Sequence, residues 1–224
     1  MTLTDSVDLL ERLLALDLDV TSRDPWWWPE SGRFATIVAA ILTQQTRYRK
    51  VEESLARLRE GGGRITPERL AAMDRDELIE CIRPSGFYRT KAERLQRFSL
   101  ALLERFGDFE TFRRRVDRAW LLARAGVGNE TADAMLCYGC HREAMVVDAY
   151  TQRLLLGFGM TFSGYEAVQS WLVEGMAARR ERVDALMGGM PLARVYALYH
   201  GLIVEYAKRH SRGREVVVAP LSGV

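Results

Sequence analysis

Apolar residues recur at intervals of three and four along most of the chain, the spacing that gathers them on one face of an α-helix. Glycine and proline interrupt these runs near residues 61–63, 83–86 and 188–191, as is typical of turns. We therefore predict an all-α fold, a helical bundle of one or two lobes. The expected helices are residues 7–18, 34–42, 51–58, 78–82, 92–103, 120–136, 150–158, 168–176 and 195–206.

Two short sequences refine this prediction. Thr66 followed by Pro67 has the composition of a helix start, because threonine caps free N–H groups and proline suits the first helical turn. Residues 215–220, EVVVAP, resemble a strand, and we expect them to belong to a loose C-terminal tail. The sequence contains no internal repeat and no linker-like segment.

The amino-acid composition indicates the general class of protein. The 224 residues are 48% hydrophobic and 28% charged, the ordinary usage of a globular protein. A net charge of +2 gives no overall basic field, and we expect the arginine clusters at residues 112–118, 177–182 and 208–214 to be solvated helix faces. Without a signal peptide or an apolar run of membrane-spanning length, we expect a soluble, cytoplasmic protein with reduced thiols.

A Gly-Val-Gly turn is the first candidate for chemistry. The sequence predicts that one helix ends at Gly126 and that the next begins near Asn129. Glycines let backbone N–H groups approach an anion, and a helix start adds free N–H groups and the positive end of the helix dipole. The turn therefore suits a phosphate, although many helix pairs turn on glycine for structural reasons alone.

Four blocks of sequence resemble, in order, those of the helix-hairpin-helix-GPD (endonuclease III-like) superfamily of DNA glycosylases. They are ILTQQT (41–46), GFYRTKAERL (86–95), AGVGNETADAM (125–135) and VVDAYTQRLL (146–155). Within the superfamily, the chain is most similar to the 3-methyladenine DNA glycosylase III branch, through DPWWWP (24–29), RPSGFY (83–88) and LCYGCHREAMVVD (136–148).

The resemblance implies a two-lobed helical fold with the active cleft between the lobes. Residues 34–143 would form a six-helix barrel that carries the helix-hairpin-helix motif. Residues 1–33 together with 144–224 would form the second helical lobe.

The resemblance assigns the catalytic role to Asp148. A carboxylate beside the sugar can stabilise an oxocarbenium-like transition state and position a water. Asp148 also suits the capping of the helix that follows, and the two roles are compatible. Relatives that also cleave the DNA strand carry a lysine where this chain has Glu130. A carboxylate cannot form an imine, so we expect hydrolysis of the N-glycosidic bond without AP-lyase activity.

The resemblance also implies residues that contact DNA. Gln45 matches a side chain that fills the space left by a flipped base, and Phe87 matches a wedge against the opposite strand. From the residues alone, Gln45 could be an ordinary helix-end glutamine and Phe87 a loop aromatic buried in the core. Further DNA contacts are expected from Gly126, Gly128 and Thr131.

The tryptophan run is expected to line the pocket for the flipped base. The resemblance places Trp27 and Pro29 on one wall and Tyr48 on the other, with Trp28 and Glu130 also at the substrate. Methylation at N3 makes adenine cationic, and a cation between aromatic faces gains roughly 0.5 to 2 kcal/mol. The flanking prolines predict an extended segment that cannot bury all three rings, and we expect at least one tryptophan to seal the lobe interface.

Two departures from the branch concern charge and cofactors. Leu202 follows the His-Gly pair at 200–201, where similar chains carry lysine, which leaves the substrate range open. No cysteine follows Cys140, so we expect no iron–sulfur cluster. Cys137 and Cys140 are expected to be buried apolar residues, because no second pair supplies the remaining ligands of a zinc site. We expect no metal or other cofactor, although the hairpin is compatible with a monovalent cation.

These features predict a monofunctional DNA glycosylase that removes alkylated bases, chiefly 3-methyladenine, from double-stranded DNA. We expect it to act as a monomer without a membrane partner. Two alternatives stay open. One is a mismatch or uracil/thymine glycosylase on the same scaffold, which would need hydrogen bonds to a neutral base. The other is a non-catalytic reader of damaged DNA, against which Asp148 argues.

Overall fold

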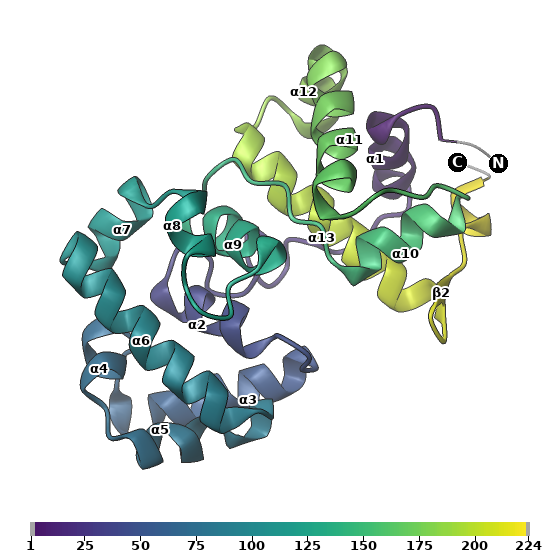
Figure 1. The fold of residues 1–224 in the computed structure, drawn as a ribbon. Helices are drawn as coiled ribbons and strands as arrows, with labels where there is room; N and C mark the ends of the chain where they lie inside the picture. The colour runs from purple at the N-terminus through teal and green to yellow at the C-terminus, as the bar shows by residue number, and fades with distance from the viewer. Residues whose placement is uncertain (1–2, 223–224) are drawn as a thin grey trace. The chain divides into compact units, whose positions relative to one another are not determined.

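The computed structural model describes residues 3–222, and nearly all of their regular structure is helical, as predicted (Figure 1). The helices are α1 (Ser6–Leu14), α2 (Phe34–Leu42), α3 (Tyr48–Arg59), α4 (Pro67–Ala72), α5 (Arg75–Ile82), α6 (Tyr88–Phe106), α7 (Phe109–Arg115), α8 (Arg118–Leu122), α9 (Asn129–Ala134), α10 (Ala149–Gly157), α11 (Tyr165–Ala178), α12 (Arg180–Met187) and α13 (Leu192–His210). Short 3-10 turns are η1 (Glu60–Gly62), η2 (Arg83–Ser85) and η4 (Ala219–Ser222), and η3 (Met135–Gly139) is a π-helical turn. β1 (Ser211–Arg212) and β2 (Glu215–Val216) form an antiparallel hairpin.

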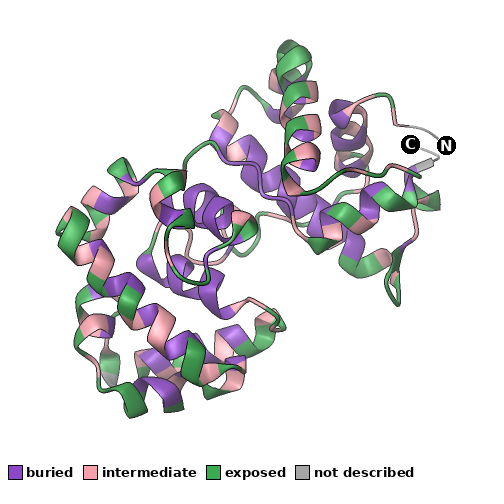
Figure 2. Cartoon of the chain, viewed as in Figure 1, coloured by how far each residue is buried: buried purple, intermediate pink, exposed green. Residues whose placement is uncertain are grey.

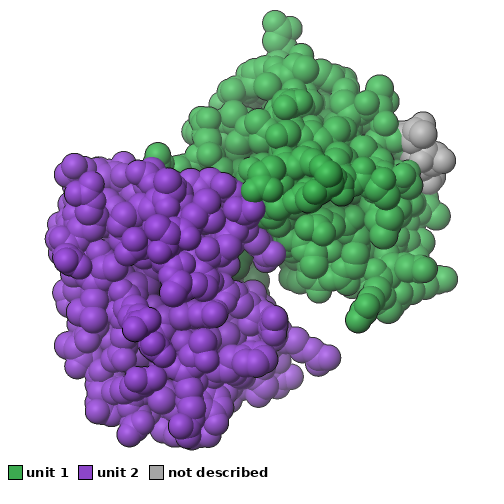
Figure 3. All heavy atoms as spheres, in the orientation of Figure 1, with its two compact units in different colours: residues 1–29, 142–224 green, residues 30–141 purple. Residues whose placement is uncertain are grey.

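The chain divides into two compact units (Figure 3). Unit 1 consists of residues 1–29 together with residues 142–224, so it is built from both ends of the sequence. Unit 2 is the continuous segment 30–141. Within residues 3–222, no helix has the length and apolar character needed to cross a membrane.

Unit 2 is organised around α2, whose sequence FATIVAAIL is apolar on every face. All of its residues are buried (Figure 2), as expected for a helix that is surrounded on all sides. Helices α3, α6 and α9 and the turn η3 pack against it, and α6 also packs against α4, α5 and α7. The two helices α2 and α6 therefore support the loops of unit 2.

Unit 1 is organised around α13, most of which is buried. Helices α1 and α10 pack against it, and α11 packs on α1. Leucine, valine and methionine side chains from these helices form one hydrophobic core with α13. This core fixes the start of α10 relative to α13, which matters for the site described below.

The C-terminal segment is ordered on unit 1, so the prediction of a loose tail is wrong. Val216 and Leu221 are buried, and β2 packs against α10. Arg12 donates a hydrogen bond to the Leu221 carbonyl at 2.9 Å, and the Tyr206 hydroxyl donates to the Val217 carbonyl at 2.6 Å. These contacts to distant residues, which the local pattern does not reveal, hold the segment in place.

The ends of α2 and the start of α4 agree with the sequence-based prediction. Helix 34–42 has its predicted ends, and Thr66 caps α4 by accepting the N–H of Arg69. The predicted helix 120–136 is interrupted, because α8 ends at Leu122 rather than at Gly126 before α9 begins at Asn129. Helices α7 and α12 lie outside the predicted stretches, since about half of the residues in these short sequences are charged.

Candidate active site

Asp148 stands directly before α10 and caps it, as predicted. Its Oδ1 accepts the N–H of Thr151 at 2.8 Å and the Thr151 hydroxyl at 3.0 Å. The Asp148 backbone is extended, which is typical of an N-cap residue. The helix start therefore holds one carboxylate oxygen, and the other oxygen, Oδ2, has a different neighbour.

That neighbour is His200 of α13. Its Nε2 lies 3.7 Å from Oδ2 of Asp148, and the histidine is buried whereas 16% of the Asp148 side chain is exposed. Burial by itself would raise the pKa of Asp148, but the nearby His200 and the hydrogen bonds from Thr151 outweigh it and hold the pKa below its ordinary value of 3.8. Asp148 is therefore ionised at neutral pH, with a small exposed surface that could stabilise a developing positive charge.

Trp27 contacts the same histidine from residues 24–29, here called the tryptophan-rich loop. The two rings meet edge to face, with centroids 5.3 Å apart and planes at 88°. The indole Nε1 of Trp27 also donates to Oε1 of Glu205 at 3.2 Å. Asp148 and Trp27 are thus both placed by contacts with α13.

The tryptophan-rich loop is folded into turns, so the prediction of an extended segment is wrong. The N–H of Trp27 donates to the Asp24 carbonyl, and the N–H of Trp28 donates to the Trp26 carbonyl, both at 2.9 Å. Trp27 has a φ of +68°, a left-handed conformation that costs a bulky residue on the order of 1–3 kcal/mol. Its surroundings must hold it there.

Gly201 gives the Trp27 indole its place on α13. A Cβ at Gly201 would lie 2.6 Å from Cγ of Trp27, so only glycine lets the ring lie this close to the helix. Leu202, where the resemblance expects lysine, is buried in the core of unit 1. The ammonium near the ring belongs instead to Lys208, which lies 5.5 Å from the Trp27 centroid and pairs with Glu205 at 2.9 Å.

Trp28 is the buried member of the run, with 8% of its surface exposed. Its ring meets that of Trp27 edge to face at 6.1 Å. Trp26 and Pro29 are half-buried. Unit 1 therefore brings together Asp148, Trp27 and Trp28, with Pro29 next along the chain.

The hairpin belongs to unit 2 and joins α8 to α9. Gly126 has a φ of +78°, and a Cβ there would collide with the Arg94 side chain, so the fold itself requires glycine. Gly128 has a φ of −97°, and a Cβ there would meet open space. The packing of the protein explains Gly126 but not Gly128.

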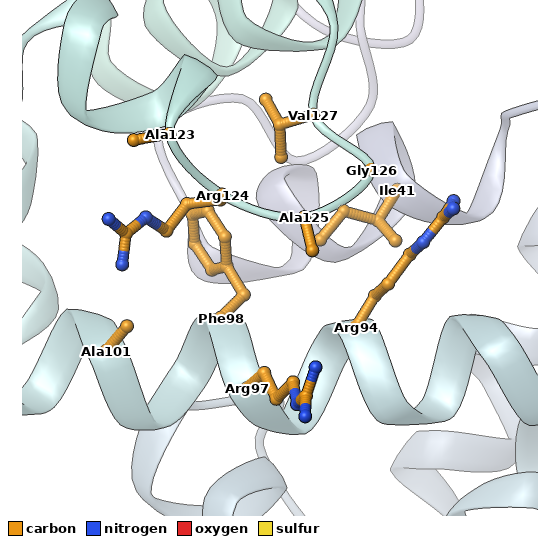
Figure 4. Close-up of a pocket in the computed structure, with 10 residues that line it drawn as sticks. All are labelled: Ile41, Arg94, Arg97, Phe98, Ala101, Ala123, Arg124, Ala125, Gly126 and Val127. Atoms are coloured by element: carbon orange, nitrogen blue, oxygen red, sulfur yellow. The ribbon is translucent and has the colours of Figure 1, made fainter.

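Two polar features frame this hairpin. Arg118, at the start of α8, makes a two-pronged ion pair with buried Asp133 of α9, at 2.8 and 3.1 Å, which ties the two helices together. In addition, Arg94, Arg97 and Arg124 line a cavity of about 160 Å³ between α6 and the hairpin (Figure 4). The hairpin is thus rigidly held and locally basic.

Gln45 and Phe87 are exposed on two loops of unit 2. Phe87 is 67% exposed, so the alternative that it is buried in the core is wrong. Gln45 follows α2 and is also exposed. Both residues have positive φ, +53° for Gln45 and +46° for Phe87. Such conformations are rare outside glycine and gather at functional sites.

The remaining candidates also lie in unit 2. Tyr48 is half-buried and begins α3, three residues after Gln45. Glu130 is exposed in the first turn of α9. Thr131 is buried, and its hydroxyl accepts a hydrogen bond from Nε2 of Gln44 at 3.0 Å. Unit 2 therefore carries Gln45 and Tyr48 on one segment, Phe87 on another, and Glu130 and Thr131 on the hairpin.

Sequence reasoning missed the side chains that support these residues. The chain has three lysines and three histidines among its 224 residues, and that scarcity was the available signal for His200, Lys91 and Lys208. Because each of them has at least one partner that is distant in sequence, their roles could be seen only in the fold. The residues are His200, Gly201, Glu205 and Lys208 on α13, and Gln44, Lys91 and Arg94 in unit 2.

The cysteines behave as predicted. Cys137 and Cys140 are buried, and burial raises the pKa of the Cys137 thiol far above its ordinary value. In the described part of the chain, no three His, Cys, Asp or Glu side chains are grouped so that they could hold a metal ion.

Comparison with known proteins shows the class to which this fold and these residues belong. A family model described as HhH-GPD superfamily base excision DNA repair protein matches residues 38–169. The chain belongs to this superfamily and is a DNA glycosylase of base excision repair.

Three individual proteins show how similar this chain is to members of the superfamily. A solved structure of H. pylori 3-methyladenine DNA glycosylase bound to 1,N6-ethenoadenine is 37% identical, with a TM-score of 0.88, and the match covers 93% of this chain and 100% of that one. A protein of Methanocaldococcus jannaschii, provisionally named a DNA repair glycosylase, is 34% identical over 83% of this chain and 81% of its own length. Endonuclease III of Thermotoga maritima is 32% identical over 61% of each chain.

Proposed function

We propose that this glycosylase excises alkylated adenine, chiefly 3-methyladenine, from duplex DNA by hydrolysis and without strand cleavage. The observation that carries the proposal is that ionised Asp148 and the indole of Trp27 both lie against His200. One group suits a developing positive charge on the sugar, and the other suits a cationic base.

Excision of such a base needs few catalytic groups besides Asp148 and Trp27. Alkylation at N3 leaves adenine positively charged, which weakens the glycosidic bond and makes the base a good leaving group. As the bond breaks, the sugar acquires oxocarbenium character, and a fixed carboxylate stabilises that charge more in the transition state than in the ground state. Asp148 would also position the attacking water.

The positions of the amines support hydrolysis over lyase chemistry. Glu130 stands where strand-cleaving relatives carry lysine, and the chain has three lysines in all. Lys91 is buried in unit 2, and Lys50 pairs with Glu53 at 2.8 Å. Lys208 pairs with Glu205 and is the amine that lies near Trp27, so it is the group to examine if a covalent intermediate forms.

DNA contacts are proposed for unit 2. Gln45 and Phe87 would enter the duplex, because both are exposed on strained loops. Gly128 would leave room for a phosphate, since the space that a Cβ would occupy there holds no protein atom within 4 Å. The further residues proposed to contact DNA or the flipped base are Gly126, Thr131, Tyr48, Trp28, Pro29 and Glu130.

A panel of duplexes with single defined lesions tests this function. The lesions are 3-methyladenine, 7-methylguanine, 1,N6-ethenoadenine, uracil and a G·T mismatch, each scored for released base under single-turnover conditions. We expect release to be fastest from 3-methyladenine. Preferred release of uracil or thymine would assign a different glycosylase, and binding without any release would assign a reader of damaged DNA.

A further inference from the structure

Lys91 of α6 is a buried lysine, with 2% of its surface exposed. Its ammonium donates to the Leu42 carbonyl at 2.8 Å, to Oγ1 of Thr46 at 2.7 Å and to the Ser85 carbonyl at 2.8 Å. An ammonium has three donors, so these three neutral oxygens use all of them. Dipoles, rather than a carboxylate, hold the charge.

The three acceptors belong to the two segments that present Gln45 and Phe87. Leu42 ends α2 and Thr46 directly follows Gln45, while Ser85 lies two residues before Phe87. The Thr46 hydroxyl also donates to the Ser85 carbonyl, so the segments touch beside the ammonium. The backbone N–H of Lys91 donates to the Phe87 carbonyl at 2.9 Å. One residue thus joins both loops.

The local backbone explains why a cation fits here. Leu42 ends α2, where carbonyl groups lack partners within the helix and the helix dipole is negative, and Ser85 ends the 3-10 turn η2. The arrangement still has a cost, since burial and the nearby Arg94 lower the pKa of Lys91 to about 8. Buried charges held at such a cost can serve to specify one arrangement of the chain rather than to stabilise it.

One turn further along α6, Arg94 extends the same network to the hairpin. It donates to Oε1 of Gln44 at 3.1 Å. The Gln44 amide in turn donates to the Gly126 carbonyl at 2.7 Å and to the Thr131 hydroxyl at 3.0 Å. The segment that presents Gln45 is therefore fixed on one side to the Phe87 loop and on the other to the hairpin.

We propose that Lys91 is a positioning residue that fixes the spacing of Gln45 and Phe87 before DNA binds, so that the two side chains enter the duplex as one rigid unit. This inference rests on the duplex-entering roles proposed above for Gln45 and Phe87. Two loops with left-handed residues would relax separately without a common anchor. A preformed spacing removes an ordering cost from DNA binding.

The test replaces Lys91 with methionine, which keeps the unbranched side chain as far as Cε but removes the ammonium and its three donors. Lys50→Met is the matched control, because Lys50 is a surface lysine of the same unit. The probe is a duplex with a tetrahydrofuran abasic analogue and 2-aminopurine placed either next to it or opposite it. 2-Aminopurine fluoresces more when it is unstacked, so it reports entry of a side chain into the duplex. We expect saturating wild type and Lys50→Met to increase the fluorescence of both reporters, that is, to brighten them. We expect Lys91→Met to lose most of this increase at both positions.

Catalysis provides a second readout. Single-turnover release of 3-methyladenine from methylated duplex should fall about tenfold or more in Lys91→Met, the scale of a small misplacement of an oriented group. Release by Lys50→Met should match wild type.

The outcomes separate this proposal from the function on which it rests. If wild type does not brighten either reporter, the duplex-entering roles of Gln45 and Phe87 are refuted and this inference with them. If wild type and a folded Lys91→Met brighten the reporters equally, the inference alone is overturned. Should Lys91→Met fail to fold by circular dichroism, Thr46→Val removes one acceptor and keeps the ammonium. Smaller brightening in Thr46→Val then supports the inference, and brightening equal to wild type overturns it.

Discussion

Oδ2 of Asp148 lies 3.7 Å from Nε2 of His200, a side chain buried in α13. The other oxygen of the same carboxylate is fixed by the start of α10. Two helices that are far apart in the sequence, α10 and α13, therefore orient one carboxylate, whose pKa remains low although it is largely buried. A preoriented charge of this kind can stabilise a transition state without reorganising during the reaction.

Replacing Asp148 with asparagine should abolish most of the chemistry and little of the binding. The amide keeps the shape and the capping ability of the side chain, so the protein should fold. It removes the charge that we propose faces the sugar, and single-turnover base release should fall by about two orders of magnitude or more. Affinity for a duplex with an abasic analogue should change little. Near wild-type release by a folded Asp148→Asn protein would move the catalytic role to another residue.

The stability of the protein should depend on Asp148 in acid. Its pKa in the folded state lies below the ordinary 3.8, so the unfolded chain takes up the proton first as pH falls. The carboxylate therefore contributes its full stabilisation above pH 3.8 and loses it as pH falls through the folded pKa. Urea unfolding of wild type and Asp148→Asn between pH 3 and pH 7, at steps of about half a unit, measures the difference. If the free energy of unfolding of wild type exceeds that of Asp148→Asn by more at low pH than at neutral pH, the lowered pKa is contradicted.

Gly201→Ala should displace Trp27. The new Cβ would lie within 3 Å of the base of the indole, where the side chain cannot swing away. Overpacking of this kind costs about 1–3 kcal/mol, which thermal unfolding would report. If Trp27 forms a wall of the base pocket as proposed, base release should fall about tenfold or more because that wall is misplaced.

A double-mutant cycle controls this result. Trp27→Leu removes the ring that the new methyl group would meet. Adding Gly201→Ala to Trp27→Leu should therefore change activity much less than adding it to wild type. Equal effects in the two backgrounds would mean that Gly201 acts through other neighbours.

The enzyme should not form a covalent intermediate with DNA. Borohydride treatment during the reaction on a 3-methyladenine duplex should trap no complex, and strand breaks should appear only after alkali. Efficient trapping would refute the hydrolytic proposal. Lys208→Met would then show whether the amine near Trp27 is the nucleophile, because loss of trapping in that variant alone would identify it.

Local signals explain what could be predicted from the sequence. Asp148, Thr66 and the start of α9 were placed correctly, because capping and glycine turns are decided within a few residues. The all-α class followed from periodicity, which needs no tertiary information. Helices α7 and α12 were missed because charge dominates their short sequences.

Tertiary contacts decide the rest. The C-terminal segment reads as a tail until Arg12 and Tyr206 are seen to bind its carbonyls. By sequence alone, Lys91 is typical of a surface lysine on an amphipathic helix. The structure shows instead that its ammonium donates to the Leu42 and Ser85 carbonyls. In each case one partner is remote in the sequence, Arg12 for the C-terminal segment and Leu42 for Lys91, and no pattern of spacing encodes it.

The assembly of unit 1 from both ends of the chain has a consequence for synthesis on the ribosome. Unit 2 is continuous, so all of its residues have been made well before the last helices appear. The apolar face of α1, by contrast, packs against α11 and α13. It emerges early and cannot be covered until those helices have been translated, at about 5–20 residues per second. During that interval α1 exposes an apolar surface of the kind that chaperones bind on nascent chains.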